Sequence, residues 1–345
     1  MSTSADDLAG RPSARSGDGN GQVDRPRPPL TQVPLSTTPL PPLDTSIPPW
    51  PGDYVESGGL RLHVRRTPGP DAPTAVYVHG LGGSATNWTD LAAQLSGIAP
   101  GFAVDLPGFG RSEPPRDYDF ALTTQAATVT AYLRQLGNGP VHLIGNSMGG
   151  AISMLIAAEH PELVRTLTLI SPAVPDLRPL LSRLSDPRLP LAFLPVVGPQ
   201  FRRQLAMLTP MERAEQLLRL CYADSSTVPE HRKAEAAEEF AERAGLAWAS
   251  TALERSTIGL FRAWLVPPSR SLWMVAPRVR VPTLVVWGTE DKLVTVRKAP
   301  RTAESLPRGR LLVLPRTGHV AQMERPVTVA RAMLGMWESA VTDAW

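Results

Sequence analysis

The sequence predicts an α/β protein built on a mostly parallel sheet with helices on both faces. Short apolar segments such as 75–78 and 141–144, typical of strands buried on both faces, alternate with segments of helical periodicity. A glycine- and serine-containing turn at 145–149 (GNSMG) follows one of these strands directly and opens a helix. The 345 residues, 42% hydrophobic and 19% charged, are enough to build a large core.

Residues 1–51 differ in composition from the rest of the chain. Eleven of the 37 prolines lie there, and Ser, Thr, Gly and Asp fill most of the remainder. Because proline removes a backbone donor and fixes φ, this segment can form neither a helix nor a central strand. We expect a disordered tail that becomes an extended arm near residues 40–50, either solvated or in contact with a surface or a partner.

Regular structure is expected from residue 59 onward, where apolar runs predict strands and amphipathic runs predict helices. The alternating run 60–64 has the pattern of an edge strand. The further expected strands are 102–104, 163–170, 283–287 and 310–314, and the expected helices are 87–95, 122–136, 148–159, 295–306 and 326–339. The core is therefore expected to comprise residues 52–170 and 278–345.

The alternation stops at residues 171–277, where several helices but no clear strand are predicted. A capping box at 209–212, with proline at the first helical position, marks the start of one helix. The segment 230–243 is a highly charged helix that we expect to face solvent. A further helix is expected to present one apolar face, made of Leu253, Thr257, Leu260, Phe261 and Trp264.

The turn at 145–149 fits the pattern G-x-S-x-G in the setting that it requires, between a buried strand and a helix. The glycines leave room for a sharp turn, and the helix N-terminus favours negative charge beside the serine. Ser147 is therefore the candidate nucleophile. Its hydroxyl needs a base at neutral pH, and His319, in the loop after strand 310–314, is the candidate.

A carboxylate should orient the histidine and stabilise its cation. Two acids, Glu290 and Asp291, compete for this role in the turn after strand 283–287, and Asp291 at the apex of the loop is favoured. An oxyanion also needs preorganised donors. The candidates are the N–H groups of Met148 and of Leu81, which lies in the glycine-rich loop after strand 75–78. His79 in that loop is expected to hold the backbone rather than to catalyse.

Composition excludes several other classes of function. The net charge of +3 comes from 35 basic and 32 acidic residues without a basic stripe, so nucleic acid is not an expected partner. The single cysteine, Cys221, excludes an internal disulfide, and no metal site is expected. No run of 18 apolar residues predicts an integral membrane segment, and the N-terminus lacks the apolar region of an export signal. A cytoplasmic location is expected, with peripheral membrane association left open.

Together these motifs resemble those of the α/β-hydrolase superfamily. The loop 79–83, the segments 105–112 and 145–150, the turn 288–291 and the pair 318–319 occur in the family's Ser…Asp…His order. The resemblance implies an eight-stranded, mostly parallel sheet with a helical lid inserted after strand six, which matches the insert at 171–277. The elbow and the histidine loop also resemble in part those of meta-cleavage-product C–C hydrolases, with Val320 in place of the tryptophan that follows their histidine.

The chemistry expected from these residues is hydrolysis of a carboxylic ester or a related acyl compound through an acyl-enzyme, without a metal or an organic cofactor. Apolar side chains of the lid predict an apolar small-molecule substrate, with Phe261, Trp264 and Val320 as candidate contacts. Further lid side chains expected to form its walls are Leu177, Leu180, Leu181, Phe193, Leu194 and Trp273. C–C bond hydrolysis and a non-catalytic ligand-binding protein are the alternatives, and the oligomeric state is not predicted.

Overall fold

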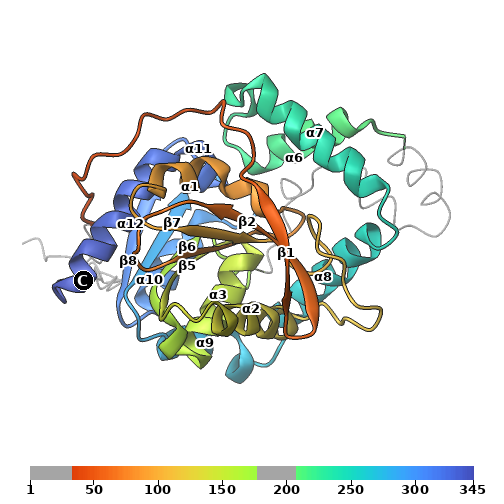
Figure 1. Cartoon of the computed structure of the whole chain (residues 1–345). Coiled ribbons are helices and arrows are strands. Elements are labelled where there is room, and N and C mark those ends of the chain that lie inside the picture. The colour runs from red at the N-terminus through yellow and green to blue at the C-terminus, as the bar shows by residue number, and fades with distance from the viewer. Residues whose placement is uncertain (1–32, 177–206) are drawn as a thin grey trace, which may run out of the picture. The chain divides into compact units, whose positions relative to one another are not determined.

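The computed structural model describes residues 33–176 and 207–345 and contains one sheet of eight strands (Figure 1). The strand order is β1-β2-β4-β3-β5-β6-β7-β8, and only β2 pairs antiparallel with its neighbours. The strands are β1 (Gly52–Ser57), β2 (Leu60–Thr67), β3 (Ala75–Val78), β4 (Gly101–Val104), β5 (Val141–Asn146), β6 (Val164–Ile170), β7 (Thr283–Gly288) and β8 (Gly309–Leu314). The predicted eight-stranded, mostly parallel sheet is confirmed.

Helices cover both faces of this sheet (Figure 1). Alternate residues of β3 serve the two faces, because Val76 and Val78 belong to one apolar cluster and Ala75 and Tyr77 to the other. The helices outside the insert are α1 (Thr89–Leu95), α2 (Leu122–Leu136), α3 (Met148–Glu159), α10 (Ala299–Glu304), α11 (Ala321–Glu324) and α12 (Pro326–Val341), with 3-10 turns η1 (Ala85–Trp88), η2 (Pro161–Leu163) and η7 (Val296–Lys298).

The observed elements agree with the sequence pattern where that pattern is strongly apolar. Helices α2 and α3 have the bounds that were expected, whereas the run 60–64, expected at an edge, lies second in the sheet. The edge strand beside it is β1, which was not predicted from the sequence. Most β1 side chains are exposed or only partly buried, so its sequence carries little apolar signal.

The chain between β6 and β7, which we call the insert, contains α6 (Pro210–Cys221), η4 (Ser225–Thr227), α7 (Glu230–Ala244), α8 (Ala249–Trp264), η5 (Pro268–Arg270), α9 (Leu272–Val275) and η6 (Ala276–Arg278). Thr209 caps α6, since its hydroxyl accepts from the Glu212 N–H at 3.2 Å while Glu212 accepts from the Thr209 N–H at 2.7 Å. Near the C-terminal end of the insert, Leu272 and Val275 of α9 pack into the main core. The expected lid residues Leu177, Leu180, Leu181, Phe193 and Leu194 lie outside the described residues.

Helix α7 faces solvent on one side, as expected, and packs its other side against the core. Arg232 forms ion pairs with Asp90 of α1 at 2.5 Å and with Glu235 at 2.7 Å, and the Thr86 hydroxyl donates to Glu239 at 3.0 Å. Charged side chains on the inner side of the helix therefore pair with polar loops of the core. The sequence did not predict these contacts, because a charged side chain can pair with a polar protein surface as well as with water.

The N-terminal arm, residues 33–51, is extended and packs against the core (Figure 1). Ser36 is buried, its hydroxyl donates to Glu338 of α12 at 2.5 Å, and its backbone exchanges hydrogen bonds with Arg331 at 3.0 and 2.9 Å. Farther along, the His231 ring of α7 donates to Thr45 O at 2.6 Å. The extended arm expected near residues 40–50 is therefore observed, and it already begins at residue 33, because backbone groups between the prolines find partners on α12 and α7. The expectation of disorder is wrong only for residues 33–39, and residues 1–32 are not described.

Candidate active site

Ser147 lies on a sharp turn between β5 and α3, with φ 53° and ψ −117°. A side chain at this φ is strained, at a cost of about 1–3 kcal/mol. The turn fits under the loop after β3, because a Cβ at position 149 would lie 2.1 Å from Val78 O and only glycine is tolerated there. Ser147 remains partly exposed, and within residues 33–176 and 207–345 its hydroxyl has no hydrogen-bond partner.

His319 and Asp291 meet at the same edge of the sheet, where the Nδ1 of the ring lies 2.9 Å from Asp291 Oδ2. The other carboxylate oxygen accepts from the N–H groups of Leu293 and Val294, both at 2.9 Å, so the carboxylate is fixed in place. The Asp291 side chain is fully buried. A proton on Nδ1 leaves Nε2 as the acceptor, which is the tautomer that a general base requires.

The competing acid, Glu290, is exposed and contributes only its backbone N–H, which donates to Thr317 O at 2.9 Å. That bond ties the loop after β7 to the loop that carries His319. Asn146, directly before Ser147, donates through Nδ2 to His319 O at 3.1 Å. The structure thus brings the turn with Ser147, the carboxylate of Asp291 and the ring of His319 to one edge of the sheet.

The loop after β3 is held by His79, as expected. Its Nδ1 donates to Gly80 O at 2.7 Å, and its Nε2 accepts from the Leu106 N–H at 3.0 Å. Burial lowers the pKa of His79, which keeps the ring neutral and suited to both bonds. Gly80 adjoins the turn, since a Cβ there would lie 3.1 Å from Ser147 Cβ. Met148 begins α3, so its N–H has no acceptor within the helix.

Asp105 is a buried support of these loops and does not contact His319. Its carboxylate accepts from the Ala85 N–H at 2.7 Å and the Arg111 N–H at 3.1 Å, and lies 2.7 Å from His63 Nδ1. Burial raises the pKa of Asp105, but the hydrogen bonds from His63 and from the Ala85 N–H help to lower it below its usual value. The apolar pattern of residues 60–64 predicted a strand at His63 but not this partner, which is 42 residues away.

The C-terminal end of α6 covers the histidine loop. The His319 N–H donates to Cys221 O at 2.7 Å. Glu324 of α11 joins the two segments, because one oxygen accepts from the Gly318 N–H at 2.7 Å and the other from the Ala223 N–H at 3.1 Å. Burial raises the pKa of Glu324, and these two backbone N–H groups oppose that rise. This junction could not be predicted from the sequence, because it depends on how the insert packs.

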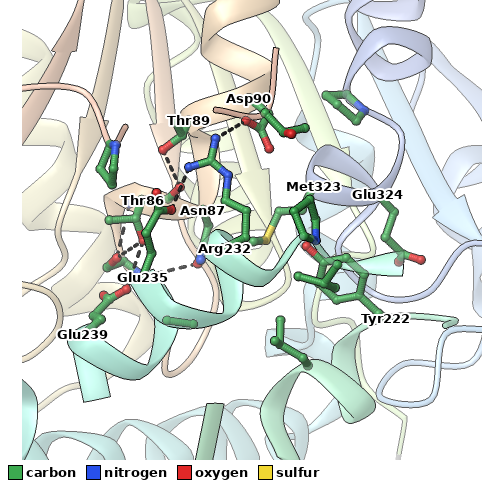
Figure 2. Close-up of a pocket in the computed structure, with 18 of the residues that line it drawn as sticks. Thr86, Asn87, Thr89, Asp90, Tyr222, Arg232, Glu235, Glu239, Met323 and Glu324 are labelled. Atoms are coloured by element: carbon green, nitrogen blue, oxygen red, sulfur yellow. Dashed lines mark hydrogen bonds and ion pairs between the residues drawn. The ribbon is translucent and has the colours of Figure 1, made fainter. Parts of the chain in front are cut away.

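Beside these loops lies a cavity of about 820 Å³ between the N-terminal arm, α1, α6, α7 and α11. Figure 2 shows Arg232 near Asp90 in this cavity, with Tyr222 and Glu324 at the side of α6 and α11. The wall combines charged side chains such as Arg232 with apolar ones such as Met323, and Ser147 is not among its lining residues. Asp291 and His319 do not line it either, so this cavity is separate from the surface that Ser147 presents.

The three expected substrate contacts have different surroundings. Trp264 is buried and donates through Nε1 to Ala173 O at 2.9 Å, which anchors α8 on the core. Val320 is buried in a small cluster under α6. Phe261 is 49% exposed, and none of the three lines the cavity. The buried face of α8 is made of Ala249, Ala252, Ser256, Leu260 and Trp264, so the expected apolar face is only partly confirmed.

In the part of the chain that the structure describes, no cluster of three or more His, Cys, Asp or Glu side chains could hold a metal ion. None of the helices in these residues is long and apolar enough to cross a membrane. Burial raises the pKa of the Cys221 thiol to about 12, so it is a poor candidate for a nucleophile.

A family model described as alpha/beta hydrolase fold matches residues 73–326. The chain is 26% identical to the 2-hydroxy-6-oxo-6-phenylhexa-2,4-dienoate hydrolase of Burkholderia cepacia, over 78% of this chain and 89% of that protein. It is 29% identical to the monoacylglycerol lipase abhd6-B of Xenopus laevis, over 78% and 76%. A membrane phospholipase A described as a bacterial virulence factor superposes with a TM-score of 0.68 at 25% identity, over 85% of this chain and 87% of that one.

A further relative is longer than this chain. The match to the dihydrolipoyllysine-residue acetyltransferase component of the acetoin cleaving system of Cupriavidus necator has 26% identity and covers 79% of this chain but 65% of that protein.

Proposed function

The chain belongs to the alpha/beta hydrolase fold family, and from this premise we propose that it is a serine hydrolase that cleaves carboxylic esters or related acyl compounds. The observation that carries the proposal is the 2.9 Å contact between His319 Nδ1 and Asp291 Oδ2, at the edge of the sheet that also presents Ser147 on its strained turn. A nucleophile, a base and a carboxylate that orients the base are the parts that acyl transfer requires.

In the proposed reaction, His319 Nε2 takes the proton of the Ser147 hydroxyl as its oxygen attacks the acyl carbonyl. The N–H groups of Leu81 and Met148 donate to the oxyanion of the tetrahedral intermediate. The imidazolium returns the proton to the leaving alcohol, and an acyl-enzyme remains. Water then gives a proton to His319 and attacks the acyl carbon, which releases the acid and restores Ser147.

We propose an apolar acyl group, because apolar side chains adjoin the proposed oxyanion donors. Leu253 of α8 is 41% exposed, and its Cδ1 would lie 3.7 Å from a Cβ at Gly82, next to Leu81. Phe261, two turns farther along the helix, is 49% exposed. If this surface contacts the substrate, each buried methylene should add up to about 0.8 kcal/mol of binding.

Labelling with a fluorophosphonate and turnover of a p-nitrophenyl ester series test this proposal. Ser147→Ala should lose labelling and reduce kcat by about 10³-fold or more, because the nucleophile is gone. Ser226→Ala, at an exposed position outside the site, is the control and should keep both. A Ser147→Ala variant that retained a tenth of the wild-type turnover would rule out this nucleophile, and unlabelled wild-type protein would favour a non-catalytic binding protein.

Hydrolysis of a C–C bond in a meta-cleavage product is the second candidate. The observation that favours it is the likeness to the dienoate hydrolase of Burkholderia cepacia along most of both chains. The same Ser147 and His319 would serve a vinylogous diketone. A direct comparison of kcat/KM for such a dienoate and for the best p-nitrophenyl ester separates the two, and a dienoate preferred by tenfold or more would replace the ester proposal.

A further inference from the structure

An arginine of the insert contacts the loop that carries the proposed oxyanion donor. Arg243, near the end of α7, donates through Nη1 to Gly82 O at 2.9 Å. Gly82 has φ 77°, a conformation that L side chains rarely adopt, and this geometry sets the direction of its carbonyl. The Arg243 guanidinium also lies 5.5 Å from the centre of the Phe109 ring, so packing restricts its position.

This contact continues through two peptide groups to Leu81. The peptide that carries Gly82 O also carries the Gly83 N–H, which donates to Gly80 O at 3.1 Å. Gly80 O in turn shares a peptide with the Leu81 N–H. In a planar trans peptide the C=O and the N–H point in opposite directions, so fixing Gly80 O fixes the direction of the Leu81 N–H.

We propose that Arg243 is a positioning residue that orients and polarises the Leu81 N–H through the Gly82–Gly83 and Gly80–Leu81 peptides. Hydrogen-bonded peptides polarise one another, and a cation at the first carbonyl strengthens the donor at the far end. His79 supports the same Gly80 carbonyl from the core, at 2.7 Å. The inference rests on the proposed function, in which Leu81 donates to the oxyanion.

Arg243 is one of several attachments of α7 to the core. Arg232 pairs with Asp90, and Arg111, on the loop after β4, pairs with Glu242 at 3.1 Å. The Glu239 carboxylate accepts from the Thr86 hydroxyl at 3.0 Å. Loss of the Arg243 side chain should therefore leave α7 docked and affect chiefly the loop.

Turnover of a p-nitrophenyl ester and of its thionoester tests the proposal. Sulfur is a weak hydrogen-bond acceptor, so the ratio of the two rates reports on donation to the oxyanion. Arg243→Met should lower kcat for the ester about tenfold, with little change in KM. The loss for the thionoester should be smaller, so that the ratio of the ester rate to the thionoester rate falls. Arg243→Lys, which keeps the charge, should restore part of the ratio, and Arg111→Met is the matched control that should keep it.

Amide exchange supplies a readout that does not depend on turnover. In Arg243→Met, exchange in a peptide covering residues 79–84 should become several times faster than in the wild type or in Arg111→Met. An unchanged rate ratio in active protein, or unchanged exchange, would overturn the role of Arg243. If the wild type cleaves no ester and Ser147 is not labelled, the proposed function fails, and the oxyanion role of Arg243 fails with it.

Discussion

The sheet and the loops at its carboxyl-terminal edge are held in place by different interactions. Every residue of β3 and β5 is buried, and their side chains pack into apolar clusters on both faces. The loops are held instead by hydrogen bonds between their backbone and polar side chains, among them the buried His79 and Asp105 and the partly buried Glu324. Apolar packing tolerates small shifts, whereas a hydrogen bond fixes a direction. We therefore expect substitutions in the sheet to change chiefly stability, and substitutions in the loops to change chiefly activity.

The largest loss of activity without a loss of stability is expected at Asp291. Asp291→Asn should reduce kcat by about 10³-fold or more, because the amide cannot stabilise the imidazolium and favours the wrong ring tautomer. The melting temperature should change little, since the side chain is nearly isosteric. Glu290→Gln, one residue earlier and exposed, is the matched control and should stay within twofold of the wild type. A larger loss in Glu290→Gln would show that the orienting carboxylate has been misassigned.

Glu324 joins a loop of the core to the insert, so we expect its substitution to change both activity and stability. Glu324→Ala leaves the N–H groups of Gly318 and Ala223 without their acceptor, at about 1–3 kcal/mol each if water does not replace it. Activity should fall by about tenfold as His319 loses its support, and urea unfolding should show a lower free energy. Glu324→Gln keeps one acceptor and should lie between. Glu304→Ala, on the exposed end of α10, should match the wild type in both measurements.

His142 in β5 should affect stability but not activity, in contrast to Asp291. Its ring stacks on Trp337 with centroids 3.9 Å apart, and burial lowers its pKa to about 3. Since an unfolded histidine titrates near 6.5, the unfolded chain binds more protons below that pH. The stability gained by keeping the His142 ring neutral in the folded protein is fully present above about pH 6.5. It is lost as the pH falls below that value, by up to about 1.4 kcal/mol per pH unit.

Urea unfolding at pH 7 and pH 5 measures this effect. The free energy of unfolding of the wild type should fall by about 2 kcal/mol more between these pH values than that of His142→Gln. Turnover at pH 7 should be similar in both proteins. An equal fall in the free energy of unfolding for the two proteins would mean that the ring accepts a proton in the folded sheet and that burial there is less complete than the geometry indicates.

The smallest effect is expected from the N-terminal arm. A chain that begins at residue 41 lacks the contacts of Ser36 with Glu338 and Arg331, and should lose about 2 kcal/mol of stability with turnover unchanged. A chain that begins at residue 33 keeps every contact described and serves as the control. Melting temperature measures both, and equal values for the two truncations would show that residues 33–40 add nothing to the free energy of folding.

The sequence predicted the parts of the fold whose signal is local. The bounds of α2 and α3 and the turn at Ser147 follow from apolar periodicity and from a short motif. Strand β1 has no such pattern, because it forms an exposed edge. The contacts of α7 with the core were not predicted, since periodicity does not distinguish water from a polar protein surface such as that around Asp90.

At the candidate site, residue types and chain order predicted that His319 would meet a carboxylate, and loop position favoured Asp291 over Glu290. The contacts of Arg243 and Glu324 were not predicted, because each joins the insert to a core loop far away in sequence. The pairing of His63 with Asp105 likewise depends on how β2 lies beside β4. Such long-range pairs leave no spacing rule in a single sequence.

The position of the insert also sets an order of events in folding. Strands β6 and β7 are neighbours in the sheet, yet the whole insert separates them along the chain. Closing so long a loop slows their pairing, because entropy is lost before the contacts form. The bond from the His319 N–H to Cys221 O must await both that pairing and the docking of α6. After dilution from urea, we therefore expect far-UV circular dichroism to recover before esterase activity, with the delay reporting the docking of α6.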